Sequence, residues 1–333
     1  MRKYHIYGLG AALVDTEVEV SDYDLQNYNI NKGVMTLVDE ARQHELMVHL
    51  ADHLAASRRT SGGSAANTVI AASYFGANTF YSCKVANDDN GQFYLNDMHT
   101  AGVELAPGVD QNEGITGKCL VMITPDAERT MNTFLGVSDT VSIKELHQPA
   151  VQSSQYIYIE GYLATSETGR HAAIHLRNWA EAHNIKTSIS LSDPAMVEFF
   201  RDDLQSMIGD RVNLLFCNKA EALAFTDSNT VGEAVEALKS IADEFAITLG
   251  DKGALVYDGQ QCLEIAPCKV DAIDTNGAGD MFAGAFLYAI TYGYSRQQAG
   301  NLASAAAAQV VSQFGPRLRP EQHGEILTKV FAR

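Results

Sequence analysis

Residues 274–290 read DTNGAGDMFAGAFLYAI, and this stretch is the most informative pattern in the chain. A strand-like segment, KVDAI at 269–273, precedes it. The run of small and apolar residues that follows Asp280 predicts a buried helix. A strand, a glycine-rich turn and a buried helix in this order are typical of α/β proteins that bind an anionic ligand at the start of the helix.

The glycines and the acidic residue of this stretch suit phosphoryl transfer to an alcohol. Gly277 and Gly279 allow a tight turn, so that the N–H groups of Gly277, Ala278 and Gly279 can face a phosphate or a developing anion. Asp280 stands where the helix dipole favours its ionised form. An ionised carboxylate beside such a site can take the proton of a hydroxyl group as its oxygen attacks phosphorus. By composition alone, a capped helix after a glycine turn explains the same residues equally well.

Outward from this stretch, short apolar strands alternate with segments of helical pattern. This alternation predicts a mostly parallel sheet with helices on both faces. No internal repeat or linker divides residues 1–333, so we expect one α/β domain, in which an excursion at 16–50 and a hairpin at 111–135 pair as a small β lid. Strands are expected at 4–9, 34–37, 80–86, 156–160, 188–191, 214–217 and 246–249, hairpins at 116–135 and 254–268, and helices at 39–56, 64–75 and 91–101.

Composition limits the classes of partner. The chain has 24 Lys plus Arg against 41 Asp plus Glu, a formal net charge of −17, so it shows no basic face for a nucleic acid. Phosphates must therefore be held by local groups, because the overall field repels them. Five cysteines without a CxxC pair fit a reducing cytoplasmic setting, and no apolar run is long enough to predict a membrane span.

Residues 274–280 resemble the DTxGAGD signature of the PfkB, or ribokinase-like, kinases at every position. Three further segments resemble family motifs: SGGSAANT at 61–68, the NxxE motif at 218–221, and TxGxxG at 248–253. The resemblance extends from Gly8 to about residue 315. It implies a three-layer α/β/α sandwich with a small β lid. It also implies an ATP- and Mg²⁺-dependent kinase that uses Asp280 as catalytic base.

The resemblance assigns substrate and nucleotide residues one by one. Asp15, after the first strand, is expected to accept hydrogen bonds from substrate hydroxyls, next to Gly62, Gly63 and Asn67. Arg129 is expected to reach the transferred phosphate, although Ala127 replaces the glycine of the common GER wording. On the nucleotide side the resemblance assigns Thr248, Gly250, Gly253 and Asn218, and it assigns Mg²⁺ to Asn218 and Glu221, through water. The helix near 304–313 is expected to flank the nucleotide base.

Within the family, Asn276 of the signature and the strand YIYIEGYLAT at 156–165 are most similar to adenosine kinases. This similarity implies a nucleoside acceptor, phosphorylated at its 5′-hydroxyl, with an apolar pocket for its base. Two alternatives stay open: a sugar kinase acting on ribose, fructose or a related sugar, and a non-catalytic sugar- or nucleotide-binding protein. The expected pocket residues are Leu13, Met35, Leu37, Leu120, Met122 and Phe134, with either Tyr162 or Leu163, although packing between strands explains apolar residues at these positions nearly as well.

Several features are left undecided by the sequence. The family includes enzymes that bind a monovalent cation such as K⁺ and enzymes that form a homodimer through the lid. The Gly8-x-Gly10 pair is not a dinucleotide fingerprint, because Leu13 occupies the third glycine position. His49, Asp52 and His53 resemble a metal cluster, but a polar helix face explains them better.

Overall fold

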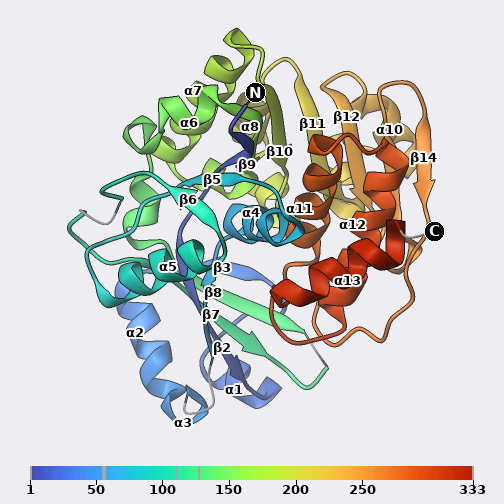
Figure 1. The fold of residues 1–333 in the computed structure, drawn as a ribbon. Helices are drawn as coiled ribbons and strands as arrows, with labels where there is room; N and C mark the ends of the chain where they lie inside the picture. The colour runs from blue at the N-terminus through green and yellow to red at the C-terminus, as the bar shows by residue number, and fades with distance from the viewer. Residues whose placement is uncertain (1, 55–57, 110–111, 127, 332–333) are drawn as a thin grey trace.

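Parallel strands form the centre of the protein (Figure 1). The computed structural model describes residues 2–54, 58–109, 112–126 and 128–331. In this part of the chain the main sheet has nine strands, and all of them run in one direction except β13, which is antiparallel to its neighbours β12 and β14 near one edge. Their order is β14 (Cys262–Ile265), β13 (Ala254–Tyr257), β12 (Ala242–Thr248), β11 (Val212–Asn218), β10 (Lys186–Ser190), β9 (Ser154–Glu160), β1 (Tyr4–Leu9), β5 (Thr79–Ser82) and β6 (Val103–Leu105).

Helices cover both faces of this sheet, because its strands are apolar on both sides. In β1, Ile6 belongs to the core on one face and Tyr7 to the core on the other. The first face carries α4 (Ser64–Phe75), α5 (Asp89–Thr100), α11 (Ala278–Thr291), α12 (Arg296–Val311) and α13 (Pro320–Phe331). The opposite face carries α6 (Gln148–Gln152), α7 (Glu167–Ala182), α8 (Pro194–Ile208), α9 (Lys219–Phe225) and α10 (Val231–Leu238).

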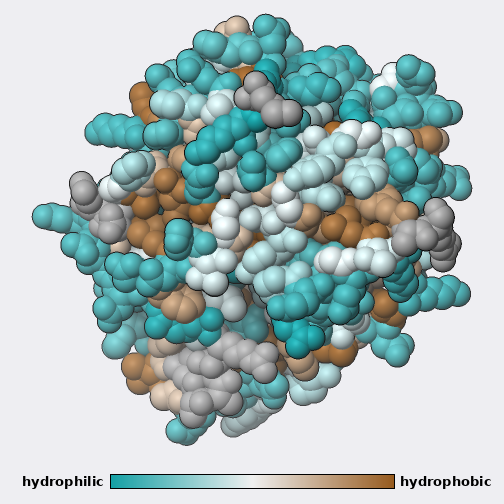
Figure 2. Space-filling view, viewed as in Figure 1, coloured by the Kyte–Doolittle hydropathy of each residue, from teal (hydrophilic) through white to brown (hydrophobic). Residues whose placement is uncertain are grey.

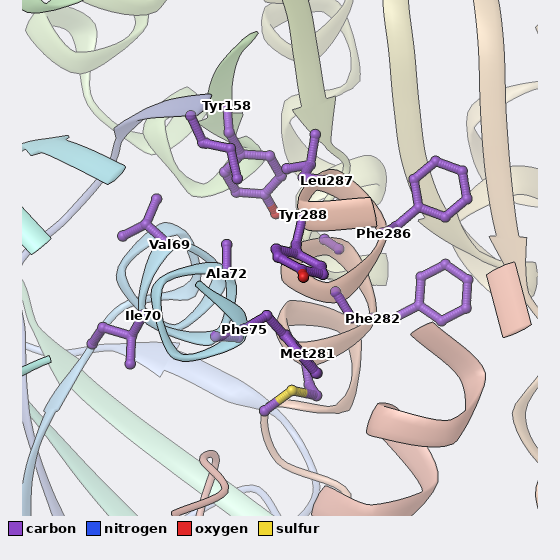
Figure 3. Close-up of a cluster of buried hydrophobic side chains, with 14 of the residues drawn as sticks. Val69, Ile70, Ala72, Phe75, Tyr158, Met281, Phe282, Phe286, Leu287 and Tyr288 are labelled. Atoms are coloured by element: carbon purple, nitrogen blue, oxygen red, sulfur yellow. The ribbon is translucent and has the colours of Figure 1, made fainter. Parts of the chain in front are cut away.

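Helices α4 and α11 pack against each other on the first face (Figure 3). In Figure 3, Val69 and Ala72 of α4 lie to the left of the α11 side chains, and Phe75 stacks on Tyr288 with ring centroids 5.5 Å apart. A Cβ atom on Gly284 would lie 2.5 Å from the carbonyl oxygen of Thr68, so only glycine permits this approach. Because both helices begin at the same edge of the sheet, their first turns are brought together.

A smaller sheet lies below the main one in Figure 1. Within the described residues it has the order β3 (Met35–Leu37), β8 (Arg129–Phe134), β7 (Gly117–Ile123), β2 (Leu13–Glu19) and β4 (Arg58–Gly62). It therefore combines parts of the two ranges expected to pair, 16–50 and 111–135, with a further strand, β4. Its outer face packs on a core of its own with α1 (Asp22–Asn27) and α2 (Glu40–His49), followed by the short α3 (Ala51–Leu54).

Two expected elements differ from those observed. The helix expected at 39–56 breaks at Leu50 into α2 and α3, because the backbone of Leu50, with φ of −96° and ψ of 16°, leaves the helical conformation. KVDAI at 269–273 is not a strand. At its end, the N–H of Ile273 donates to the carbonyl of Val311 at 2.7 Å. This segment is therefore hydrogen-bonded to the end of α12 and not to a strand of the sheet.

The surface agrees with the acidic composition. Figure 2 shows a face that is mostly hydrophilic, with smaller hydrophobic areas between the hydrophilic ones. Within the ranges that the structure describes, no helix combines the length and the apolar character needed to cross a bilayer. The cysteines in these ranges are unpaired, with Cys83, Cys119 and Cys217 buried and Cys262 and Cys268 exposed.

The α4–α11 contact gives a test of the fold. Gly284→Ala is expected to lower the free energy of unfolding by about 1–3 kcal/mol, because the added methyl group would overlap the α4 backbone. Gly324→Ala is the matched control, since Gly324 is an exposed helical glycine with nothing within 4 Å of its Cβ position. That variant should raise the free energy of unfolding by about 0.5–1 kcal/mol. Urea denaturation followed by circular dichroism measures both, and equal effects would contradict the packing described.

Candidate active site

A cavity of about 490 Å³ opens at the carboxyl ends of the parallel strands, where α/β sheets usually bind ligands. The ends of β9, β10, β11 and β12 contribute Glu160, Ser190, Asn218 and Thr248 to its wall. The inner face of the smaller sheet closes another side, and the loop before α11 forms part of the lining. The cavity therefore lies between the two sheets and next to the sequence stretch from which the fold was predicted.

The loop before α11 has the geometry that its glycines require. Gly277 has φ of 74°, in the left-handed region, and a Cβ there would lie 2.3 Å from the carbonyl oxygen of Pro316. Ala278 begins the helix, but its N–H donates to the carbonyl of Thr275 at 3.3 Å and so is not directed to the cavity in this conformation. The N–H groups of Gly279 and Asp280 belong to the first turn, where no intrahelical partner exists.

Asp280 lines the cavity and is held on both of its oxygens. Ser64 Oγ donates to Oδ1 at 2.6 Å, and Asn67 Nδ2 donates to Oδ2 at 3.1 Å. Burial raises the pKa of Asp280 to about 6, against these two hydrogen bonds and the charge of Arg317, which lower it. Asp280 is therefore ionised at neutral pH, as expected. Burial raises its pKa, whereas the dipole of α11 was expected to lower it.

Asp15 is buried in β2 and lines the cavity, so it lies in a strand and not in the loop after β1. Burial raises its pKa to about 7, while the charge of Arg317 lowers it. Gly62 is opposite Leu13 in the neighbouring strand β4, and a Cβ on Gly62 would lie 2.1 Å from Asp15 Oδ1. Gly62 thus makes room for the carboxylate, whereas Gly63, with φ of 101°, lines the cavity itself.

Asn218 and Glu221 form the start of α9. Asn218 Oδ1 accepts from the N–H of Glu221 at 2.9 Å, and the N–H of Asn218 donates to Glu221 Oε2 at 2.9 Å. This reciprocal capping box fixes both side chains at the cavity wall. Burial raises the pKa of Glu221 to about 7 against the hydrogen bonds from Asn218, and the nearby Asp193 raises it further.

Of the three nucleotide-loop residues beyond Asn218, Thr248 lines the cavity at the end of β12. Gly250 and Gly253 bound the short 3₁₀ turn Gly250–Lys252 and are not among the described lining residues. A Cβ on Gly253 would lie 2.1 Å from the carbonyl oxygen of Ile265, so the close approach of the backbone requires glycine at this position. The end of α12, expected to flank the nucleotide base, also lies outside the lining.

Arg129 is the first residue of β8 and lines the cavity, but carboxylates hold its guanidinium. Its Nε and Nη2 bind Asp274, whose side chain is fully buried, and Nη1 lies 3.4 Å from Glu17 Oε1. Asp274 also accepts from the N–H of Gly315 at 2.6 Å. The positive charge is therefore compensated in this conformation, and Ala127 of the expected motif lies outside the described residues.

Glu160 is a cavity residue that the sequence reasoning missed. It ends β9 and accepts from the N–H groups of Ala11 and Ala65, each at 2.7 Å. Burial raises its pKa to about 7, and a Cβ on Gly10 would lie 2.5 Å from its Oε2. The available signal was an acidic residue at the end of the apolar strand YIYIE, a position at which a side chain faces the ligand edge.

Charge is unevenly distributed around the cavity. Arg129 is the one basic side chain among the described residues that line it. Since Arg129 is already paired, an anionic ligand would need an added cation or backbone N–H groups. The lining carboxylates are those of Asp15, Glu128, Glu160, Asp193, Glu221 and Asp280.

The expected apolar pocket is only partly where it was predicted. Leu13, Met35, Leu37 and Tyr162 line the cavity. Successive residues of a strand point to opposite faces, so the neighbours of Cys119 in β7 point away from it. Leu120 and Met122 accordingly lie in the core with α1 and α2, Leu163 lies in the core behind the main sheet, and Phe134 is not a lining residue.

The histidines of the expected metal-like cluster have other contacts. His49 stacks on Tyr28, and His53 Nδ1 lies 2.8 Å from the carbonyl oxygen of Glu19. Asp52 and His53 belong to α3, and His49 to α2. The residues with described positions include no group of three His, Cys, Asp or Glu side chains that could hold a metal ion directly.

Comparison with known proteins agrees with this geometry. An adenosine kinase from Saccharomyces cerevisiae is 28% identical over 334 aligned residues, which cover 94% of this chain and 96% of the yeast protein. A crystal structure of an adenosine kinase from Sinorhizobium meliloti has a TM-score of 0.89 and 29% identity, covering 97% of this chain and 99% of that one. A probable sugar kinase from Rhizobium etli has a TM-score of 0.91 and 27% identity, covering 99% and 100%.

These two structures confirm the ribokinase-like α/β fold. The model of the pfkB family of carbohydrate kinases matches residues 34–322, which is most of the chain. The protein is therefore a kinase that belongs to the pfkB family.

Proposed function

We propose that this kinase transfers the γ-phosphoryl group of ATP to the 5′-hydroxyl of an adenosine-type nucleoside. The observation that carries the proposal is the placement of Asp280, in the first turn of α11, in one cavity with Asp15 and with apolar residues of the smaller sheet. A nucleoside has hydroxyls for Asp15 and Asn67, and an apolar base that suits Leu13, Met35 and Leu37. The named yeast and S. meliloti relatives support this acceptor.

In the proposed reaction, the acceptor hydroxyl donates a hydrogen bond to Asp280 and its oxygen attacks the γ-phosphorus. Asp280 takes the proton, the new P–O bond forms, and ADP leaves with the electron pair of the bond that breaks. The N–H groups at the start of α11, from Gly277 to Gly279, stabilise the charge that develops on the transferred group. Ala278 can contribute only if its N–H leaves the carbonyl of Thr275.

A magnesium ion fits the charges of this cavity. Asn218 and Glu221 present oxygen atoms at the wall, and oxygen is the ligand that Mg²⁺ prefers, through its water shell where the ion stays hydrated. The bound ion would supply positive charge to the phosphates among the lining carboxylates. Thr248 and Asn218 are the proposed nucleotide contacts on this side. For a monovalent cation such as K⁺ we assign no ligands, because Asp274 beside the loop is already held by Arg129 and Gly315.

We also propose that the smaller sheet acts as the lid of a single kinase domain. It carries Asp15 and Arg129 to one wall of the cavity, so its position decides whether water can enter. Arg129 would supply positive charge beside the transferred group once Asp274 releases it. A homodimer through this sheet remains a proposal, with β3 and β4 as the available edge strands.

A sugar kinase is the second candidate, and Glu160 favours it. A carboxylate at the floor of the cavity can accept hydrogen bonds from further hydroxyls, which a sugar offers in place of a base. The structural similarity to the R. etli protein, described as a probable sugar kinase, points the same way. Both candidates share Asp280 and its chemistry, and they differ in whether the rest of the acceptor lies against apolar residues of the smaller sheet or against Glu160.

Replacing the proposed base tests the mechanism. Asp280→Asn is expected to lower kcat by roughly 10²–10⁴ while ATP binding persists, because the amide cannot take the hydroxyl proton. Asp210→Asn is the matched control, since Asp210 is exposed just before β11, at the end of the sheet opposite to the cavity. Steady-state kinetics and calorimetric ATP binding measure the two variants. Near-normal turnover of Asp280→Asn would refute the assignment.

The pH dependence of the rate follows from the pKa of about 6 for Asp280. Only the ionised carboxylate can accept the proton, so kcat is expected to fall as the pH drops through about 6 and to level off above 7. The residual turnover of Asp280→Asn should lack this acidic limb, because the amide does not titrate. A limb that persists unchanged in that variant would assign it to another group.

The acceptor is tested by turnover of ATP and Mg²⁺ with adenosine, inosine, guanosine, ribose and fructose. Adenosine is expected to be the best acceptor, and Leu37→Gln should raise its KM about fivefold to tenfold by weakening contact with the base. Val34→Gln is the control, since Val34 and Leu37 are both 44% exposed but only Leu37 lines the cavity. Turnover with a sugar alone would select the second candidate.

A further inference from the structure

Arg317 connects the catalytic helices to the rest of the protein although it does not line the cavity. It lies between α12 and α13, and its side chain is only 14% exposed. Each guanidinium nitrogen has a partner: Nε donates to Asn67 Oδ1 at 3.0 Å, Nη1 to Asp97 Oδ2 at 2.8 Å, and Nη2 to Ser61 Oγ at 2.8 Å. These partners lie in α4, α5 and β4, so one side chain joins three elements.

The contact with Asn67 decides which way its amide faces. Asn67 Oδ1 accepts from Arg317, so Nδ2 is left to donate to Asp280 Oδ2 at 3.1 Å. The flipped amide would place its NH₂ against the guanidinium and its oxygen against the carboxylate, which are two repulsive contacts. Arg317 therefore fixes the orientation in which Asn67 stabilises the ionised base.

The charge of Arg317 also acts on the cavity. It lowers the pKa of Asp280 and of Asp15, in both cases against the effect of burial. Arg129 acts on Asp15 in the same direction, but it is bound to Asp274 and Glu17. The other titratable groups that act electrostatically with Asp280 are Asp15, Glu160, Tyr158 and Tyr162.

We infer that Arg317 is a positioning residue of this kinase: it orients the Asn67 amide toward Asp280 and supplies a partly buried positive charge close to the base. Its role depends on Asp280 being the base, as proposed above. Asp97 holds the arginine in place, since it accepts from Nη1 and from the backbone and hydroxyl of Ser61. A lysine could supply the charge but could not reach three partners, because only the guanidinium has a rigid fork of donors.

The test is the pH profile of kcat for Arg317→Gln and for Arg319→Gln. Arg319 is an exposed arginine two residues along the same segment, so its variant makes the same change in net charge. Arg317→Gln is expected to move the acidic limb up by about one pH unit, so that the loss of kcat is about tenfold greater at pH 5 than at pH 9. Arg319→Gln should keep the wild-type limb. An equal loss at both pH values would overturn the inference.

Two further variants separate the effect of the Arg317 charge from the effect of the Asn67 orientation. One of them also provides a test if Arg317→Gln does not fold. Arg317→Lys is expected to keep the acidic limb near its wild-type position but to lower kcat at all pH values, because Asn67 loses its fixed partner. Asp97→Asn keeps an oxygen that can accept from Nη1 of Arg317, so the arginine stays in place, but it removes a negative charge, so the limb should move to lower pH. If Arg317→Gln does not fold, an unmoved or raised limb in Asp97→Asn overturns the inference.

The same assay on Asp280→Asn distinguishes the two proposals. An active Asp280→Asn variant would refute the assignment of the base, whatever Arg317 does. An inactive Asp280→Asn variant together with an unmoved limb in Arg317→Gln would refute the role of Arg317 alone.

Discussion

The close approach of α4 and α11 is the constraint on which the site depends. The first turn of α4 carries Ser64 and Asn67, the first turn of α11 carries Asp280, and the two helices lie side by side on one face of the sheet. Gly284 sets their separation, because no side chain fits between it and the backbone of α4. A wider spacing would separate Asp280 from both of its hydrogen-bond donors, so the packing one helical turn beyond Asp280 sets the position of its carboxylate.

The second constraint is electrostatic. The cavity gathers carboxylates that burial makes costly to ionise, as the raised pKa values of Asp15, Glu160 and Glu221 show. An empty site of this kind destabilises the folded protein at neutral pH, and a bound cation or a set of substrate hydroxyls relieves that cost. The burial of these carboxylates therefore opposes folding at the cavity. Arg317, which lies outside the lining, and Arg129, which belongs to it, both reduce this cost for Asp15.

Much of this could be predicted from the sequence, because the relevant signals are local. The periodic strands, the helix after Asp280 and the two hairpins follow from patterns of a few residues, and the glycine-rich loop carries its own conformational requirement. The predictions that were wrong concern residues whose structure depends on the surrounding fold and not on the local sequence pattern. Residues 269–273 have the composition of a strand, but Ile273 is hydrogen-bonded to the end of α12. Leu120 and Met122 point to the outer face of β7, because alternate residues of a strand point to opposite faces. Arg317 could not be found from its neighbours, since its partner Asn67 lies 250 positions away.

The ion pair of Arg129 with Asp274 has a consequence for movement between the two sheets. Its cation belongs to β8 and its anion to the loop before α11, so any outward swing of the smaller sheet pulls them apart. Both groups would then regain the hydration that they lost on burial, and this recovery offsets much of the attraction given up. If the smaller sheet moves as the proposed lid, its closed and open positions would therefore differ by less free energy than the number of contacts suggests.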